Sequence, residues 1–264
     1  MLIPRNPSAP LLLQPSFDPR VQTPRDIIRN ARSQPIDLAL MHFVTNDHDM
    51  LAMKAHVRKL AFEPDPILIQ GPSGVGKEII ASVLSKGAVD SKLFTINCGA
   101  LPASIIHSIL FGHKRGSFTG ATEDYPGVLV EAHHSCATVF LDEIGKLPLD
   151  LQGLLLRAIQ YKVVTPVGST KEVSINNCRF ISAAKEDLLA LVDAGKFLED
   201  LYGRIYTHIV NITPLFARPG DIDLIAHSLG HNEPIPDSQY NTGVNIFRFN
   251  VRAIIAYIKR HELA

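Results

Sequence analysis

The stretch Gly71-Pro72-Ser73-Gly74-Val75-Gly76-Lys77-Glu78 lies between an apolar run, residues 66–70, and a helical pattern, residues 79–84. A strand, a glycine-rich loop, a lysine and a helix in this order make a P-loop. Its backbone N–H groups and helix N-terminus bind a triphosphate, and its lysine reaches the terminal phosphates. We therefore predict that residues 71–78 bind ATP. Glu78 departs from the general pattern, since a Ser or Thr hydroxyl usually binds Mg²⁺ at this position.

A second element of an ATPase site is Val139-Phe140-Leu141-Asp142-Glu143. An apolar strand that ends in two carboxylates would place Asp142 near Mg²⁺, as its protein ligand, and would let Glu143 orient or deprotonate the attacking water. Asn97 ends another apolar run, residues 93–97. Two interpretations of Asn97 stay open: it senses the γ-phosphate by contacting Glu143, or it is an ordinary strand-end asparagine.

The charge, cysteine content and apolar runs of the chain limit the classes of protein to which it can belong. The 264 residues include 26 Lys and Arg and 26 Asp and Glu, so no overall basic field indicates nucleic-acid binding. Three scattered cysteines fit buried thiols in a reducing compartment better than a disulfide framework. The apolar run of residues 11–13 is too short for a signal peptide or a membrane span. We expect a soluble cytoplasmic protein with no membrane partner.

The order of patterns along the chain predicts the fold. Apolar strands at 66–70, 93–97, 137–142, 178–183 and 208–213 alternate with helices at 102–111, 149–161 and 186–192, and a helix at 50–60 precedes them. Strands that are apolar on both faces indicate an α/β fold with a mostly parallel sheet covered on both sides. This core is predicted to span residues 41–218.

The two ends of the chain have weaker patterns. Seven of the 18 prolines fall within residues 1–40, which predicts an extended arm, with a short helix at 24–32. Residues 219–264 are predicted to form a small helical lid, with a helix at 221–229, a polar loop at 230–243 and a terminal helix at 249–263.

The run Leu110-Phe111-Gly112-His113-Lys114-Arg115-Gly116-Ser117-Phe118-Thr119-Gly120-Ala121 resembles the GAFTGA loop of sigma-54-dependent transcription activators, the bacterial enhancer-binding proteins within the AAA+ ATPases. The resemblance extends from about residue 43 to 222 and resumes at Asn250-Val251-Arg252. It includes Glu78, residues 94–98, residues 141–145 and residues 199–202 with Arg204. It implies a three-layer AAA+ sandwich with a reduced lid, ATP and Mg²⁺ bound between subunits of a hexameric ring, and sigma-54 RNA polymerase holoenzyme as partner.

The loop of residues 116–121 also makes sense from its residue types. Gly116 and Gly120 frame Phe118 and Thr119, so a hinged loop would hold an aromatic ring and a hydroxyl in solvent. An exposed phenylalanine is a plausible partner contact, and a phenylalanine buried in a turn is the alternative. By resemblance, the loop Gly116, Ser117, Phe118, Thr119, Gly120 and Ala121 binds the sigma factor.

Other residues that match the family, or differ from it, bear on ATP hydrolysis. By resemblance, Arg204 reaches the γ-phosphate of a neighbouring subunit, and Arg252 reads the nucleotide from the lid. Leu198 stands where the family has a further trans-acting arginine, and Ala184-Lys185 replaces its sensor Thr-Asn. ATP binding is therefore a safer prediction than fast turnover.

The leading hypothesis for function is ATP-driven remodelling of sigma-54 RNA polymerase that activates transcription. Two alternatives remain: an ATP-binding regulator with impaired hydrolysis, and an AAA+ scaffold with a different protein client. No receiver-type domain precedes the core and no helix-turn-helix domain follows it in these 264 residues. We therefore expect no sequence-specific DNA-binding domain.

Overall fold

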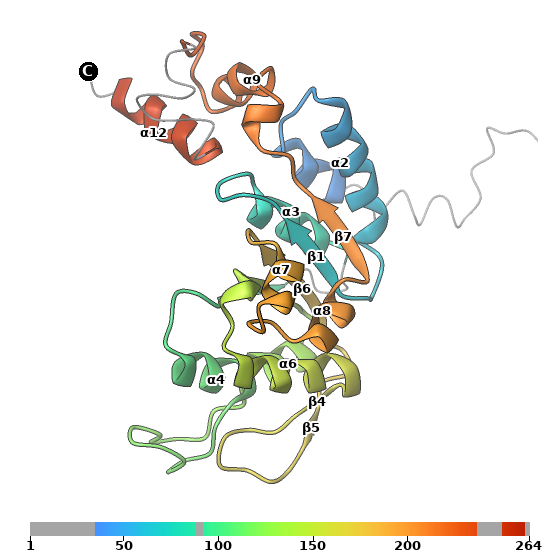
Figure 1. Ribbon diagram of the computed structural model, residues 1–264, viewed down its shortest axis with the longest axis vertical. Helices are drawn as coiled ribbons and strands as arrows, with labels where there is room; N and C mark the ends of the chain where they lie inside the picture. Colours follow the sequence, from blue (N-terminus) through green and yellow to red (C-terminus); the bar gives the residue numbers. More distant parts are fainter. Residues whose placement is uncertain (1–34, 88–91, 237–249, 262–264) are drawn as a thin grey trace, which may run out of the picture.

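The computed structural model describes residues 35–87, 92–236 and 250–261. Its centre is a five-stranded sheet in which every pair of neighbours is parallel, in the order β2-β3-β6-β1-β7 (Figure 1). The strands are β1 (Ile67–Gln70), β2 (Leu93–Asn97), β3 (Thr138–Asp142), β6 (Arg179–Ala184) and β7 (His208–Asn211). The predicted α/β class and parallel sheet are confirmed. Residues 1–34 of the predicted arm (1–40), including its helix at 24–32, and residues 237–243 of the predicted loop at 230–243 lie outside the described residues.

Helices cover both faces of the sheet. Ile67 and Ile69 of β1 belong to one apolar cluster, and Leu68 between them belongs to the other, as alternation along a strand requires. The first face is covered by a helix at residues 35–41, α2 (His48–Leu60) and α3 (Lys77–Ser85). The second is covered by α4 (Ala103–Phe111), α5 (Val128–His134), α6 (Leu149–Tyr161), α7 (Leu188–Asp193) and α8 (Glu199–Ile205). The result is a three-layer sandwich.

Part of the predicted arm is folded. Residues 35–41 are helical, and Ile36 and Leu40, one helical turn apart, are 0% and 6% exposed in the first cluster. Their apolar spacing outweighs the proline at position 35, because a proline is tolerated in the first turn of a helix. The sandwich therefore includes residues before 41.

A buried arginine at the amino-terminal end of strand β6 binds the C-terminal ends of two helices. The guanidinium of Arg179, at the start of β6, donates to the carbonyls of Leu60 (2.8 Å) and Ala61 (3.0 Å) at the end of α2. It also donates to the carbonyl of Leu84 (2.8 Å) at the end of α3. Carbonyls at helix ends lack partners within their own helix, so one cation satisfies both C-termini.

Smaller elements complete the described structure. The lid contains α9 (Asp221–Ser228) and α12 (Val251–His261), which pack through an apolar cluster with Leu215 in the 3-10 helix η2 (Leu215–Ala217). A second 3-10 helix, η1 (Ile144–Lys146), follows β3. The hairpin of β4 (Val163–Val164) and β5 (Val173–Ser174) was not predicted, because strands of two residues give no readable alternation. Within the described ranges, no helix has the length and apolar character that crossing a membrane requires.

Candidate nucleotide site

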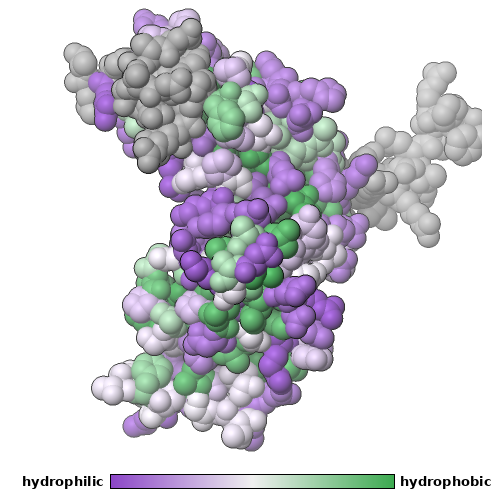
Figure 2. Space-filling model, in the orientation of Figure 1, coloured by the Kyte–Doolittle hydropathy of each residue, from purple (hydrophilic) through white to green (hydrophobic). Residues whose placement is uncertain are grey.

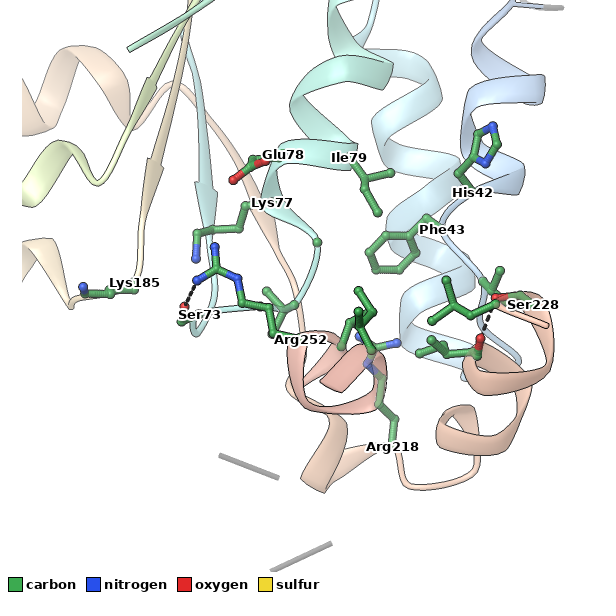
Figure 3. Close-up of a pocket in the computed structure, with 18 of the residues that line it drawn as sticks. His42, Phe43, Ser73, Lys77, Glu78, Ile79, Lys185, Arg218, Ser228 and Arg252 are labelled. Carbon is green, nitrogen blue, oxygen red and sulfur yellow. Dashed lines mark hydrogen bonds between the residues drawn. The ribbon is translucent and has the colours of Figure 1, made fainter. Parts of the chain in front are cut away.

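A cavity of about 340 Å³ lies between the sheet, the residue 71–78 loop and the lid (Figure 3). Its polar end is lined by residues 73–78, Asp142, Glu143, Lys185 and Arg252, and its apolar end by Phe43, Ile79, Ile225, Leu229, Val251 and Ile255. Figure 2 shows the molecule narrowing between the lid, at the top of the view, and the part at the bottom of the view. Hydrophilic side chains gather at this narrow part. The cavity thus has one end suited to phosphates and one suited to an apolar ring.

The P-loop has the geometry that its sequence predicts. It follows β1 and ends at α3, whose N-cap Gly76 has a φ of 106°, in the left-handed region that favours glycine. The ammonium of Lys77 donates to the carbonyls of Gly71 and Pro72, both at 2.8 Å. Burial lowers the pKa of Lys77, and the nearby Asp142 and Glu143 carboxylates oppose that shift. Gly71 and Pro72 therefore orient Lys77, and residues 73–78 line the cavity.

Asp142 is the last residue of β3 and Glu143 follows it, beside this loop. The Glu143 backbone is left-handed (φ 53°), and its N–H donates to Asp142 Oδ1 at 2.9 Å. Burial raises the pKa of Asp142, while the Glu143 N–H and Lys77 lower it. Among the described residues, no cluster of three or more Asp, Glu, His or Cys side chains is arranged to hold a metal. Asp142 fits Mg²⁺ in another way, because Mg²⁺ is commonly held by one or two carboxylates together with phosphate oxygens and water.

Glu143 has a partner that the sequence interpretation did not assign. Its Oε1 lies 3.2 Å from the ammonium of Lys185, which follows β6. Asn97 pairs in register with Asp142, but its Oδ1 accepts the N–H of Gly99 at 2.8 Å. No hydrogen bond joins Asn97 to Glu143 in the described structure, and a Cβ added at Gly99 would lie 2.7 Å from Glu143 Oε2. The role of Asn97 as a sensor stays a prediction.

The start of α12 lies on the P-loop. Arg252 Nη1 donates to the Ser73 hydroxyl at 3.2 Å, and the Val251 N–H donates to the Gly74 carbonyl at 3.1 Å. Asn250, fully buried, donates from Nδ2 to the Ser73 carbonyl (3.0 Å) and accepts the Leu215 N–H at Oδ1 (2.8 Å). Sequence reasoning identified Arg252 but missed Asn250, although Asn250 directly precedes it in the matching triplet.

Arg204 lies away from this cavity. It lines a second cavity, of about 600 Å³, together with residues of α6, β6 and the segment that precedes β1. Its helix α8 leads into β7, whose first residue His208 pairs with Ile67 at the start of β1, whereas the P-loop follows the end of β1. Leu198, at the N-cap of α8, packs against the core cluster. A role for Arg204 at a neighbouring subunit's site stays a prediction.

The loop of residues 116–121 is a closed turn at the end of the molecule opposite the lid (Figure 1). The Gly116 N–H donates to the Ala121 carbonyl (2.8 Å) across the turn. Phe118 is 45% exposed, and its ring meets the edge of the His113 ring with centroids 5.0 Å apart. Ser117 Oγ is buried without a hydrogen-bond partner, and a Cβ added at Gly168, in the β4–β5 loop, would lie 2.6 Å from Ser117 Cβ. This geometry favours the exposed interpretation of Phe118, with Thr119 beside it.

The sigma-54 interaction domain family matches residues 43–211, well over half of the chain. The chain belongs to this family. The matched range contains the P-loop, Asp142, Glu143, Arg204 and the 116–121 loop, so the resemblance seen in the sequence is confirmed. As a sigma-54 interaction domain the chain is an AAA+ ATP-binding domain of the kind found in transcription regulators.

Relatives of this sigma-54 interaction domain are named as response regulators or transcriptional regulatory proteins. The chain is 39% identical over 201 residues to the response regulator protein PilR of Pseudomonas aeruginosa, covering 75% of this chain and 44% of PilR. It is 43% identical over 188 residues to the transcriptional regulatory protein GlrR of Escherichia coli, covering 70% of this chain and 42% of GlrR. It therefore spans less than half the length of these two relatives.

A solved structure supports the fold. The crystal structure of NtrX from Brucella abortus in complex with ATP superposes with a TM-score of 0.70 at 24% identity, covering 82% of this chain and 51% of that chain. The complex of NtrX with ADP gives a TM-score of 0.71, also at 24% identity, and covers 89% of this chain and 55% of that chain. At this identity the structural similarity establishes the fold of this chain and no other property.

Proposed function

We propose that this domain binds ATP with Mg²⁺ in the 340 Å³ cavity and uses its hydrolysis to remodel sigma-54 RNA polymerase holoenzyme, which activates transcription. The observation that carries the proposal is the convergence of Lys77, Asp142, Glu143 and Arg252 on one cavity. Family membership supports the identity of the client. The proposed place of action is the cytoplasm.

The residues of the cavity divide the work of binding and hydrolysis. Lys77, whose present partners are two neutral carbonyls, exchanges them for the terminal phosphates, and the N-terminus of α3 adds backbone N–H groups. Glu143 orients the attacking water and accepts its proton. Mg²⁺, when bound by Asp142, neutralises charge on the phosphates. Glu78 brings a third carboxylate to the cavity wall without a hydroxyl for the metal.

The apolar end of the cavity fits the base of the nucleotide. Phe43 lies on the sandwich side, and Ile225, Leu229 and Ile255 come from the lid, so a base bound there contacts both parts. Arg252 meets the P-loop from the lid side at the polar end. Nucleotide binding would therefore fix the position of the lid relative to the P-loop.

The client-binding part is the 116–121 loop. Phe118 and Thr119 stand between two glycines that have no atoms within 4 Å of an added Cβ, so both ends of the tip face open space. In the proposed ring, a hexamer, Arg204 projects from the edge remote from its own P-loop and serves a neighbour's nucleotide. An exposed aromatic tip on a ring subunit fits a protein that pulls or displaces a partner.

Capture of sigma-54 holoenzyme in the presence of ADP–aluminium fluoride, which imitates the transferred phosphoryl group, tests this function. We expect capture by the unmodified chain, loss of capture with Phe118→Ala or Thr119→Ala, and retention with Phe216→Ala. Phe216 is a matched control because it is 59% exposed on η2, outside the loop. Failure of the unmodified chain to capture sigma-54 would count against the proposed client.

A second candidate is a regulator that binds ATP but hydrolyses it poorly. The ion pair between Lys185 and Glu143 favours it, since it occupies the carboxylate that hydrolysis needs. The packing of the partly buried Leu198 against the core favours it too, because that position offers no cation to a neighbour. Measurable ATP turnover that Glu143→Gln abolishes would exclude this candidate, whereas binding of ATP without turnover would establish it.

A further inference from the structure

The cavity of about 600 Å³ that Arg204 lines is at the amino-terminal ends of the strands, whereas the nucleotide cavity is at their carboxyl ends. Its lining includes residues one or two positions before β1, β3, β6 and β7, together with the end of α6. Its volume lies in the range of pockets that hold small organic molecules. The domain therefore has room for a ligand that is separate from the nucleotide.

The buried part of the wall of this cavity contains a guanidinium with an unused donor. Arg179 is 9% exposed, and its two terminal nitrogens donate to three carbonyls at the ends of α2 and α3. Its Nε is buried and has no hydrogen-bond partner in the described structure. A buried donor without an acceptor is destabilising. Because Arg179 lines the cavity, an oxygen bound there would supply the missing acceptor.

Lys162 adds an ammonium that is also short of partners. It is the C-cap of α6, and its side chain lines the cavity. Its Nζ has one hydrogen-bond acceptor among the described residues, the Cys178 carbonyl at 3.3 Å, and lies 5.0 Å from the centre of the Phe180 ring. An ammonium has three donors, so two are available to a ligand. Burial lowers the pKa of Lys162, as expected where desolvation outweighs nearby negative charge.

The backbone around this cavity is strained. Lys162 has a φ of 56° and Cys136, which also lines the cavity, has a φ of 49°. They are two of the four non-glycine residues with positive φ in the described ranges, and a third, Glu143, lines the nucleotide cavity. Such positions favour glycine, and strained residues cluster at binding sites. A lysine kept where glycine would be unstrained indicates a role for its ammonium.

The charges at the rim leave positive charge available to a ligand. Arg204 is exposed, and its side chain forms no hydrogen bond or ion pair with any described residue. The acidic lining residues, Glu63 and Asp65, are exposed too, and Asp65 lies 3.8 Å from the imidazole of His208. Water screens these exposed carboxylates more than it screens the less exposed Lys162. The inner part of the cavity is therefore suited to an anion.

We propose that this cavity binds a small organic molecule with two acidic groups. Oxygens of one group accept hydrogen bonds from Lys162 Nζ and Arg179 Nε, and the other group pairs with Arg204 at the rim. Charge-assisted hydrogen bonds of this kind are stronger than those between neutral groups. The site goes beyond the proposed function and does not depend on ATP binding. Carboxylate and phosphate offer the same oxygen acceptors, so both are tested.

Calorimetry with the full chain and three probes tests the site: succinate, phosphoglycolate and the neutral succinamide. Lys162→Met is compared with Lys171→Met, the matched control, because Lys171 is exposed in the β4–β5 loop and does not line the cavity. Lys77→Met reports any anion that binds at the P-loop instead. Lys162→Gly is a second variant, since glycine is unstrained at this φ. Circular dichroism melting verifies that each variant is folded.

We expect at least one of the two dianions to bind with a Kd of about 1 mM or below, as two or more charged hydrogen bonds allow, and succinamide not to bind. Lys162→Met and Lys162→Gly should each weaken binding about tenfold, and Arg204→Met about threefold. Lys171→Met and Lys77→Met should leave it within about twofold. Tighter binding of phosphoglycolate than of succinate would assign a phosphate to the site, and the reverse would assign a second carboxylate.

The outcomes that contradict this site differ from those that contradict the nucleotide site. Absence of binding by both dianions at about 10 mM, or equal binding of succinamide, would overturn it. Binding that Lys77→Met weakens and Lys162→Met does not would place the anion at the P-loop, which would overturn this site and leave the nucleotide site standing. A chain that binds a dianion through Lys162 but does not bind ATP would overturn the proposed function alone.

Discussion

Replacing Asn250 should weaken the contact between the lid and the P-loop and so lower the free energy of unfolding. The size of the loss should depend on whether the new residue tolerates the positive φ at this position. Asn250 is fully buried, has a φ of 55° and makes two side-chain hydrogen bonds. Asn250→Gly leaves the buried Leu215 N–H without a partner, which costs about 1–3 kcal/mol, and removes the bond to the Ser73 carbonyl, worth about 1 kcal/mol. The expected loss in free energy of unfolding is therefore about 2–4 kcal/mol.

Asn250→Ala should cost about 1 kcal/mol more than Asn250→Gly, because alanine is strained at positive φ whereas glycine is not. Urea unfolding followed by circular dichroism measures both variants, since the chain has no tryptophan. Asn176 is the control: it is exposed and has no positive φ, so alanine there should be no worse than glycine. The reasoning is refuted if Asn250→Ala is as stable as Asn250→Gly, or if both lose less than about 1 kcal/mol.

Four further perturbations have defined outcomes. Ser117→Ala should raise the melting temperature, because it removes a buried hydroxyl without a partner and so stabilises by about 1 kcal/mol; a lower melting temperature would show that this hydroxyl is hydrogen-bonded. Burial raises the pKa of Cys98 and Cys178 to about 12, so a maleimide at pH 8 should label the exposed Cys136 alone, and mass spectrometry showing two or three labels on folded protein would contradict this. Because the folded pKa values exceed the ordinary value of 9.0, these two thiols stabilise the fold below pH 9, and that stability should be lost as pH rises from 9 toward 12. Gly99→Ala should lower ATP turnover but not ADP affinity, because the added Cβ displaces Glu143. Gly153→Ala is the control: it has open space around it in α6 and should leave both quantities unchanged. Equal turnover in the two variants would refute the steric argument.

The parts of the site that sequence reasoning predicted are those set by local patterns. The P-loop and the Asp142–Glu143 pair each lie at the carboxyl end of an apolar strand, and parallel strands bring these ends to one edge of a sheet. The spacing of apolar residues was enough to predict α6, and β6 to within a residue at each end.

The parts that it missed depend on contacts between distant segments. The partner of Glu143 is Lys185, 42 residues away. The bond from the Gly99 N–H to Asn97 Oδ1 is local by contrast, since an asparagine side chain often accepts the N–H two residues further on. Asn250 binds Ser73 across 177 residues. The helix at residues 35–41 was missed for a different reason, since a high density of prolines concealed the spacing of Ile36 and Leu40.

The buried guanidinium of Arg179 has a consequence for how the domain can move. Because it binds carbonyls at the C-terminal ends of both α2 and α3, the helix that carries Lys77 is anchored at the end remote from the phosphates. The lid, which forms the opposite wall of the cavity, is hydrogen-bonded to the P-loop through Asn250, Val251 and Arg252. Its Asp221 also accepts hydrogen bonds from Thr45 and Asn46, just before α2. We therefore expect α3 to stay fixed to the sheet through a cycle of nucleotide exchange, while the lid takes up the displacement.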